Sequence, residues 1–289
     1  MNITPIEYTP GMEINPPCFI QNMPNEAYHN HPEGISSTGM KAMLVSAAHF
    51  KFQPAYTNTR PKELGTAIHT ALLEPDRYAA EYVLLREVKV RTASEYKQAV
   101  KVHGRELVLV SHEADKVAGM QEAVLSNELM RSRLNGEGWR ELSLFVRDPD
   151  TGVLVRVRFD LLLTDGTIVD VKKTQDARPD AFSRAIDNYG YDLSAALYAD
   201  ALQWATGEEG QFEFAAVEEE MPHGHKLYRP CDTTLNEGRR KYREALATFA
   251  NCEYIGVWPS LPCDAPELIS LPAYRLSQIE NALEDGGIY

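Results

Sequence analysis

Three consecutive segments between residues 139 and 174 alternate apolar and polar side chains with a period of two, and this pattern restricts the fold most strongly. The alternating segments are residues 141–146, 153–161 and 167–172. Turn sequences separate them, namely Asp-Pro-Asp-Thr-Gly at 148–152 and Thr-Asp-Gly at 164–166. The pattern therefore predicts three consecutive β-strands joined by tight turns.

Helical periodicity lies on both sides of these strands. The predicted helices are residues 40–44 after the N-cap signal Ser36-Ser37-Thr38, residues 63–73, segments within residues 93–134, one long helix from Pro179 through Trp204, and a basic helix after Thr234. Residues 211–217 predict a fourth strand. This order of elements predicts an α/β (α+β) fold with a central mixed sheet flanked by helices.

The domain organisation follows from length and composition. A chain of 289 residues with 44% hydrophobic and 25% charged residues is an ordinary globular chain with enough material for a sizeable core. We expect one domain over residues 1–289. Residues 1–34, rich in Pro, Asn and His, predict an irregular N-terminal arm, and residues 139–220 contain the strands and the helix that carry the candidate site.

The formal net charge of −13 argues against a protein that coats nucleic acid with its whole surface, but it leaves room for a local basic channel. The four cysteines form no C-x-x-C pair, so we expect reduced thiols and no zinc ribbon or conventional iron–sulfur pattern. Neither a signal peptide nor an apolar stretch of about 20 residues is evident. We expect a cytoplasmic protein that does not contact the membrane.

The residues that carry chemistry lie on the second and third predicted strands. Side chains alternate faces along a strand, so Asp170 and Lys172 project to one side, and the hairpin can bring Asp160 close to Asp170. Two carboxylates that converge beside a lysine are costly unless a cation compensates them. Oxygen ligands favour Mg²⁺, with Mn²⁺ as a substitute, over zinc. The alternative is a set of solvated charges on the polar face of an edge hairpin.

This order of motifs resembles the PD-(D/E)xK nuclease core, and specifically the RecE-type (exonuclease VIII) nuclease domain of its RecB-like branch. The resemblance covers roughly residues 20 to 220. The resembling pieces are residues 23–29, residues 35–41, Gly65-Thr66-Ala67-Ile68-His69, Glu141, Arg158-Phe159-Asp160, Asp170-Val171-Lys172-Lys173-Thr174 and the segment from Tyr191 to Tyr198. One departure is Ser194, which stands where the family usually carries a glutamine.

The resemblance implies roles for individual residues. Asp160, Asp170 and the main-chain carbonyl of Val171 would bind the metal, and His69 and Glu141 would complete the cluster. Lys172 would orient the attacking water and stabilise the transition state. Tyr198 would line the active site. Each residue also has an alternative interpretation. His69 could be a histidine on an amphipathic helix that binds no metal, and Glu141 could be a solvated carboxylate at the edge of a strand. Tyr191 and Tyr198 could pack in the core.

The resemblance also implies a function: a Mg²⁺-dependent exonuclease that digests double-stranded DNA from 5′ ends and leaves 3′ single-stranded tails. The implied partners are DNA ends, a RecT-like single-strand annealing protein in phage or prophage recombination, and further copies of the chain in a ring. Candidate phosphate contacts are Arg86, Lys89, Arg91 and the cluster from Arg239 to Arg243, which could equally be solvated faces. The rivals are a Cas4- or AddB-like nuclease with an iron–sulfur cluster and a non-catalytic DNA-binding protein with the nuclease fold.

Overall fold

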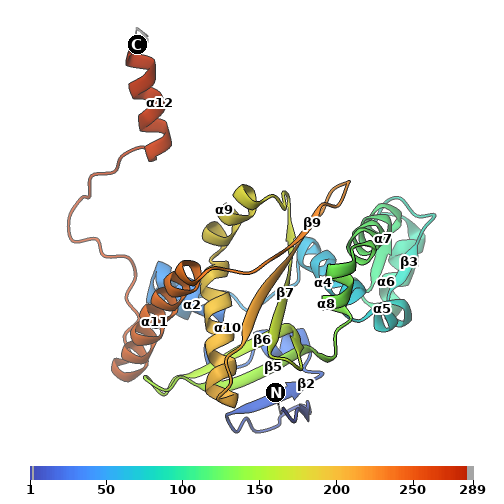
Figure 1. Cartoon of the computed structure of the whole chain (residues 1–289), viewed down its shortest axis with the longest axis horizontal. Coiled ribbons are helices and arrows are strands. Elements are labelled where there is room, and N and C mark those ends of the chain that lie inside the picture. The colour runs from blue at the N-terminus through green and yellow to red at the C-terminus, as the bar shows by residue number, and fades with distance from the viewer. Residues whose placement is uncertain (2, 285–289) are drawn as a thin grey trace.

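A mixed sheet with helices on both faces forms the centre of the computed structural model, which describes residues 1 and 3–284 (Figure 1). Within this part of the chain the sheet has the spatial strand order β1-β2-β5-β6-β7-β8-β9. Its strands are β1 (Ile6–Glu7), β2 (Cys18–Gln21), β5 (Gly138–Arg147), β6 (Leu154–Leu163), β7 (Thr167–Thr174), β8 (Gln211–Glu218) and β9 (His225–Tyr228). A separate two-stranded parallel sheet consists of β3 (Val83–Leu85) and β4 (Val108–Val110).

The helices of the described residues fall into one group before the three central strands and one group after them. Their bounds are α1 (Asn25–His29), α2 (Ser37–Val45), α3 (Ala47–Lys51), α4 (Arg60–Leu73), α5 (Pro75–Glu81), α6 (Ser94–His103), α7 (Ser111–Ser126), α8 (Glu128–Leu134), α9 (Pro179–Tyr189), α10 (Tyr191–Thr206), α11 (Asp232–Ile255) and α12 (Ala273–Glu284). The N-cap signal before α2 is confirmed, because the Ser36 side chain accepts a hydrogen bond from the main-chain N–H of Gly39.

The predicted strand order is confirmed. β5, β6 and β7 pair in antiparallel fashion, as two short turns require. The chain then crosses the sheet through α9 and α10 and returns as β8, which pairs with β7 in parallel, as a helical crossover allows. The result is the mixed α/β architecture that the sequence predicts.

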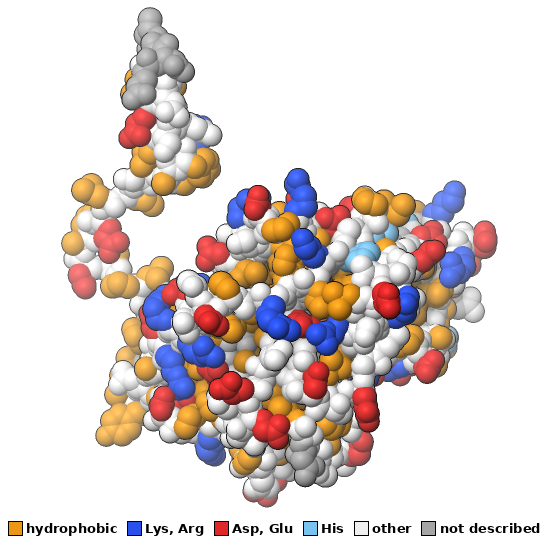
Figure 2. All heavy atoms as spheres, viewed as in Figure 1, with side chains coloured by type: hydrophobic (Ala, Val, Ile, Leu, Met, Phe, Trp, Pro, Cys, Tyr) orange, Lys and Arg blue, Asp and Glu red, His pale blue; other side chains and the backbone are white. Residues whose placement is uncertain are grey.

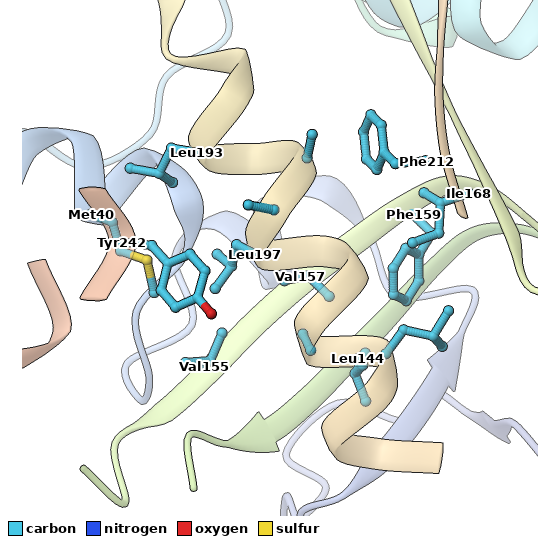
Figure 3. Close-up of a cluster of buried hydrophobic side chains, with 14 of the residues drawn as sticks. Met40, Leu144, Val155, Val157, Phe159, Ile168, Leu193, Leu197, Phe212 and Tyr242 are labelled. Carbon is cyan, nitrogen blue, oxygen red and sulfur yellow. The ribbon is translucent and has the colours of Figure 1, made fainter. Parts of the chain in front are cut away.

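The larger core lies between the sheet and the helices α2, α10 and α11 (Figure 3). α10 runs across the sheet and places Leu193 and Leu197 against Val157 and Phe159 of β6. Phe159 is completely buried, and burial of such a side chain stabilises the fold by about 1.5–3 kcal/mol. Asp160 follows Phe159 directly along β6.

A second core covers the opposite face, where α4, α7 and α8 pack on the sheet. Leu72 of α4 and Met120 of α7 lie in the same apolar cluster as Val169 and Val171 of β7. The side chains of Asp170 and Lys172 alternate with these valines and share the opposite side of β7, as the sequence predicts, and this side faces α10. α4 approaches the sheet on the other side, where it positions His69.

The predicted long helix after Pro179 is in fact two helices. Gly190 has φ +60°, in the left-handed region, and separates α9 from α10. A glycine in this conformation ends a helix and satisfies its last carbonyl groups, here through the Gly190 N–H and the carbonyls of Ile186 and Asp187. The apolar spacing continues across Gly190, so periodicity alone did not show the break.

Two other segments differ from the sequence prediction. Residues 1–34 are not irregular throughout, because they contribute β1, β2 and α1, and β2 pairs with β5. The segment 93–134 contains three helices and also β4, whose three residues are completely buried. Such a short strand is stabilised by its tertiary surroundings and gives no period-two pattern.

The chain leaves the body after α11 through an extended segment, and α12 stands apart from the rest of the molecule (Figure 1). Among the described residues, the structure has no helix with the length and apolar character required to cross a membrane.

Candidate metal and nuclease site

The site lies where β6 and β7 separate. The ladder between these two strands consists of the pairs Leu161↔Val169 and Leu162↔Ile168. At the next position toward the site, the Val171 N–H donates a hydrogen bond of 2.8 Å to the Oδ2 atom of Asp160. A side-chain carboxylate therefore takes the place of a main-chain partner. Beyond this hydrogen bond β6 and β7 form no further pairs, and Asp160 and Asp170 lie where the two strands separate.

Three potential metal ligands meet at this point. His69 comes from α4, Glu141 from β5 and Asp160 from β6, and each offers one ligand atom within 4.8 Å of the others. The Nδ1 atom of His69 lies 3.5 Å from Oδ2 of Asp160. Each of the three side chains is partly exposed. Among the described residues, this is the one group of three or more His, Cys, Asp or Glu side chains with such geometry.

The backbone of β5 is distorted at Glu141. Its neighbours pair regularly with β6, as Arg140↔Leu161 and Leu142↔Phe159, so Glu141 stands opposite Asp160. Glu141 has φ +49°, a left-handed conformation that costs a non-glycine residue about 1–2 kcal/mol. Strain of this kind is concentrated at functional sites, and here it places one carboxylate beside another.

The electrostatics of this pair favour a cation. Burial, together with the negative charge of Asp160, raises the pKa of Glu141 to about 7, and His69 and Arg158 offset only part of this increase. Two carboxylates that approach each other cannot both ionise without a compensating positive charge. A donor set of two carboxylates and one imidazole fits a divalent cation, and the three residues are directed so that they could hold one.

Asp170 and Lys172 form a second unit beside this cluster. Their side chains lie on the same side of β7 and form an ion pair. Asp170 is buried, and its Oδ2 atom accepts no hydrogen bond within the described residues, so the Lys172 ammonium is its partner. Burial raises the pKa of Asp170, and the charge of Lys172 counteracts this. The three-ligand group does not include Asp170, so the predicted sharing of one metal by Asp160 and Asp170 stays a prediction.

Lys172 is held as a cation. Burial alone would lower its pKa, but the charges of Asp170 and Asp160 more than compensate, and the pKa of Lys172 is raised. Its Nζ atom also lies 5.0 Å from the centre of the Tyr191 ring. A lysine that stays protonated suits electrostatic stabilisation of a phosphate and not the abstraction of a proton.

Val171 and Tyr198 contact the site in different ways. The Val171 side chain packs in the core beneath α4, while its N–H binds Asp160; the metal-binding role of its carbonyl stays a prediction. Tyr198 packs edge-on against Phe159, with ring centres 5.8 Å apart. Burial, with the nearby acidic groups, raises the pKa of Tyr198 well above its usual value. Tyr198 thus packs against the core, and Tyr191 is the tyrosine whose ring meets Lys172.

Arg158 is a supporting residue that the sequence indicated only as part of a motif. Its guanidinium donates to the Ser143 hydroxyl, to Asn25 Oδ1 and to the main-chain carbonyl of Met23. It thereby ties the N-terminal segment to β5 and β6, and its charge lowers the pKa of Glu141. A cavity of about 630 Å³, lined by Arg158 and by Thr66 of α4 among others, gives access to Glu141.

The basic cluster on α11 contacts carboxylates of the same chain. Arg239 pairs with Asp200, Lys241 with Asp192, Arg243 with Asp148, and Arg240 with Glu237 and Glu244. The pairs of Arg239, Lys241 and Arg243 connect α11 to α10 and to the β5–β6 turn, whereas the pairs of Arg240 lie within α11. Arg86 and Arg91 are exposed and lie 3.7 and 4.0 Å from the carboxylates of Asp115 and Glu113, and their role as phosphate contacts stays a prediction.

The cysteines do not support the iron–sulfur alternative. Cys252 is buried in the main core, Cys18 lies on β2, and Cys231 and Cys263 are exposed. The described residues bring no three cysteines into a common group.

Comparisons with known proteins bear on the family and the fold of the chain. The model of a family described as "PDDEXK-like domain of unknown function (DUF3799)" matches residues 36–272. No curated protein matches the chain. A solved structure from Eubacterium rectale, described as a "Putative exonuclease", is 13% identical, with a TM-score of 0.59 over 93% of this chain and 98% of that chain.

A second solved structure, an alkaline exonuclease from Laribacter hongkongensis, is 12% identical and covers 63% of this chain and 96% of that chain, with a TM-score of 0.25. The Eubacterium structure supports the fold, and the family match spans most of the chain. The chain therefore belongs to the family of PDDEXK-like domains, which confirms the PD-(D/E)xK nuclease core that the sequence predicts.

Proposed function

We propose that this protein is a Mg²⁺-dependent DNA nuclease whose active site is the region where β6 and β7 separate. The observation that carries the proposal is the convergence of His69, Glu141 and Asp160 beside the Asp170–Lys172 ion pair. Phosphodiester hydrolysis needs a place for a divalent cation and a separate positive group for the phosphate, and this arrangement offers both.

His69, Glu141 and Asp160 would hold the cation, with Asp170 as a further ligand whose Oδ2 atom now contacts Lys172. A divalent ion bound there supplies a water of lowered pKa and partial neutralisation of the phosphate charge. Lys172, protonated and directed by Asp170, orients the water and stabilises the charge that develops on the phosphate. Mg²⁺ fits the carboxylate oxygens best, and Mn²⁺ is expected to substitute.

The substrate we propose is the end of double-stranded DNA, digested from 5′ to 3′ so that 3′ single-stranded tails remain for phage or prophage recombination. The support for this polarity, for a RecT-like annealing partner and for a cytoplasmic location is the resemblance of the motifs to RecE-type nucleases. The support for a ring-shaped homo-oligomer is the same resemblance together with the net charge of −13. A ring would need basic side chains only along its inner channel.

The test is digestion of end-labelled linear duplex DNA by the purified chain with Mg²⁺, with EDTA, and with the variant Asp170→Asn. Asp264→Asn, at an exposed position far along the C-terminal segment, is the matched control. We expect cleavage by the wild type and the control in Mg²⁺, and none in EDTA or with Asp170→Asn. A wild type that binds DNA without cutting it would favour the non-catalytic alternative and overturn the proposal.

A further inference from the structure

A second lysine approaches the ring that Lys172 contacts. Lys41 comes from α2, and its Nζ atom lies 5.8 Å from the centre of the Tyr191 ring, while Lys172 from β7 lies 5.0 Å from the same centre. Tyr191 begins α10, so three separate elements meet at this ring. On the face shown in Figure 2, some basic side chains lie near the middle of the molecule, where acidic side chains are interspersed with them.

The Lys41 side chain passes close to the break between α9 and α10. A Cβ atom on Gly190 would lie 3.1 Å from Cε and 3.4 Å from Cδ of Lys41, closer than most real contacts. The absence of a side chain at Gly190 therefore makes room for the lysine stem. The stem packs along the start of α10, and the ammonium group is carried to the edge of the site.

The charge of Lys41 lacks a partner within the described part of the chain. Lys172 is paired with Asp170, and the nearby Lys241 with Asp192, but Lys41 forms no salt bridge and no hydrogen bond among the described residues. Lys41 is half-buried, and burial together with the positive charge of Lys172 lowers its pKa to about 8. Holding a half-buried cation next to another cation costs free energy, which an anionic ligand would recover.

We propose that Lys41, the Tyr191 ring and Lys172 form a subsite for the backbone phosphates of the DNA strand that is cut. This inference rests on the proposed function and extends it. Lys172 faces the phosphate that reacts, and Lys41 holds a neighbouring phosphate of the same strand. Lysine binds phosphate as a point charge. An aromatic ring beside two phosphate contacts can also stack against a nucleobase of the bound strand. Lys41 acts in substrate binding and takes no part in the bond-breaking step.

The test is the salt dependence of DNA binding by Lys41→Gln in EDTA, where no cleavage interferes. Loss of one phosphate contact lowers the slope of log K against log salt by about 1 and weakens binding about tenfold. Lys51→Gln is the matched control, because Lys51 also lies over an aromatic ring, at 4.6 Å from the centre of Trp258, but is exposed and does not lie over Tyr191. Lys41→Arg, which keeps the charge, should restore the slope. An unchanged slope in Lys41→Gln would overturn the subsite.

Thermal unfolding without DNA separates this role from a structural one. Removal of one of two neighbouring cations relieves repulsion, so Lys41→Gln should raise the Tm at low salt, whereas a structural lysine would lower it when lost. In the cleavage assay the Lys41→Gln variant should have a KM that is raised far more than its kcat is lowered.

The two proposals can fail separately. If the wild type does not cut DNA but the salt-dependence slope of binding still falls in Lys41→Gln, the nuclease proposal fails and the phosphate subsite stands. If the wild type cuts and the slope is unchanged, only the subsite fails.

Discussion

Oδ2 of Asp160 accepts a hydrogen bond from the main-chain N–H of Val171, 2.8 Å away, across the point where β6 and β7 separate. The same carboxylate lies within ligand distance of His69 and Glu141. Asp160 thus connects the sheet to the site, because it ends the ladder between the two strands and also contributes to the proposed cation site. Changes at Asp160 should therefore affect both folding and activity.

Asp160→Ala and Asp160→Asn separate these two effects. Both remove the negative charge, but only asparagine keeps an oxygen that can accept the Val171 N–H. We expect the alanine variant to be about 1–3 kcal/mol less stable than the asparagine variant, the cost of an unsatisfied buried donor. Urea denaturation in EDTA measures the difference, and both variants should lose nuclease activity. Equal stability of the two variants would show that the hydrogen bond does not matter for folding.

Lys172→Ala tests electrostatic stabilisation of the transition state. We expect kcat to fall by about 10²-fold or more, the scale associated with loss of one preorganised charged group, while DNA binding changes far less. Steady-state kinetics with short duplexes provide both parameters. Lys51→Ala serves as the exposed control. A defect confined to KM would mean that Lys172 only binds phosphate.

The raised pKa of Glu141 predicts a pH-dependent stability of the metal-free protein. A carboxyl group with a raised pKa binds its proton more tightly in the folded chain, so its contribution is fully present below its ordinary pKa of 4.5 and is lost as pH rises through about 7. The metal-free protein should lose up to about 3 kcal/mol of unfolding free energy from this group between about pH 5 and 8. Denaturation with EDTA over this range measures the loss.

Glu141→Gln should flatten this pH dependence, whereas the exposed control Glu267→Gln should leave it unchanged. Asp170 contributes in the same direction, because burial raises its pKa too, so some slope should persist in Glu141→Gln. Mg²⁺ binds the ionised carboxylates, so the increase in stability on adding Mg²⁺ should be larger at pH 8 than at pH 6. A Mg²⁺ effect independent of pH would contradict the assignment of Glu141 as a ligand.

The sequence predicted the parts of the fold that have strong local patterns. The alternation in residues 141–172 fixes which side chains share a face, so the common orientation of Asp170 and Lys172 follows from the period of a strand. The approach of His69 to Glu141 and Asp160 joins α4 to the hairpin of β5 and β6, which lies about 70 residues further along the chain. No local pattern encodes such a contact, and only the resemblance to known nucleases indicated it.

Other features depend on tertiary structure and were therefore not predictable from local patterns. The break at Gly190 lies inside an uninterrupted apolar repeat, and β4 is too short for a period to be seen. The basic residues on α11 were candidates for DNA contacts, but the carboxylates that they contact, such as Asp148 and Asp200, lie on other elements. The pairing of Lys41 with Tyr191 likewise requires the packing of α2 against α10.

Replacement of two helical glycines by alanine should change the stability of the protein in opposite directions. A Cβ atom on Gly238 of α11 would lie 2.1 Å from the main-chain carbonyl oxygen of Asp192 on α10, so Gly238→Ala should separate the helices and cost about 1–3 kcal/mol. A Cβ atom on Gly65 of α4 would meet nothing within 4 Å, so Gly65→Ala should stabilise the protein by about 0.5–1 kcal/mol through helix propensity. Thermal unfolding distinguishes them, and equal shifts would contradict the packing of α10 on α11.

The conflict between a net charge of −13 and a polyanionic substrate leads to a prediction about assembly. A monomer with dispersed acidic groups should bind DNA weakly, whereas a ring with basic side chains inside would hold the duplex topologically. We expect an oligomer in solution, digestion of linear duplex and little or no digestion of covalently closed circles, which offer no end. Binding should still weaken with salt, because contacts in the channel displace counterions. Light scattering, combined with digestion of linear and closed-circular forms of one plasmid, tests this directly. A monomer that cuts both forms equally would identify an endonuclease instead.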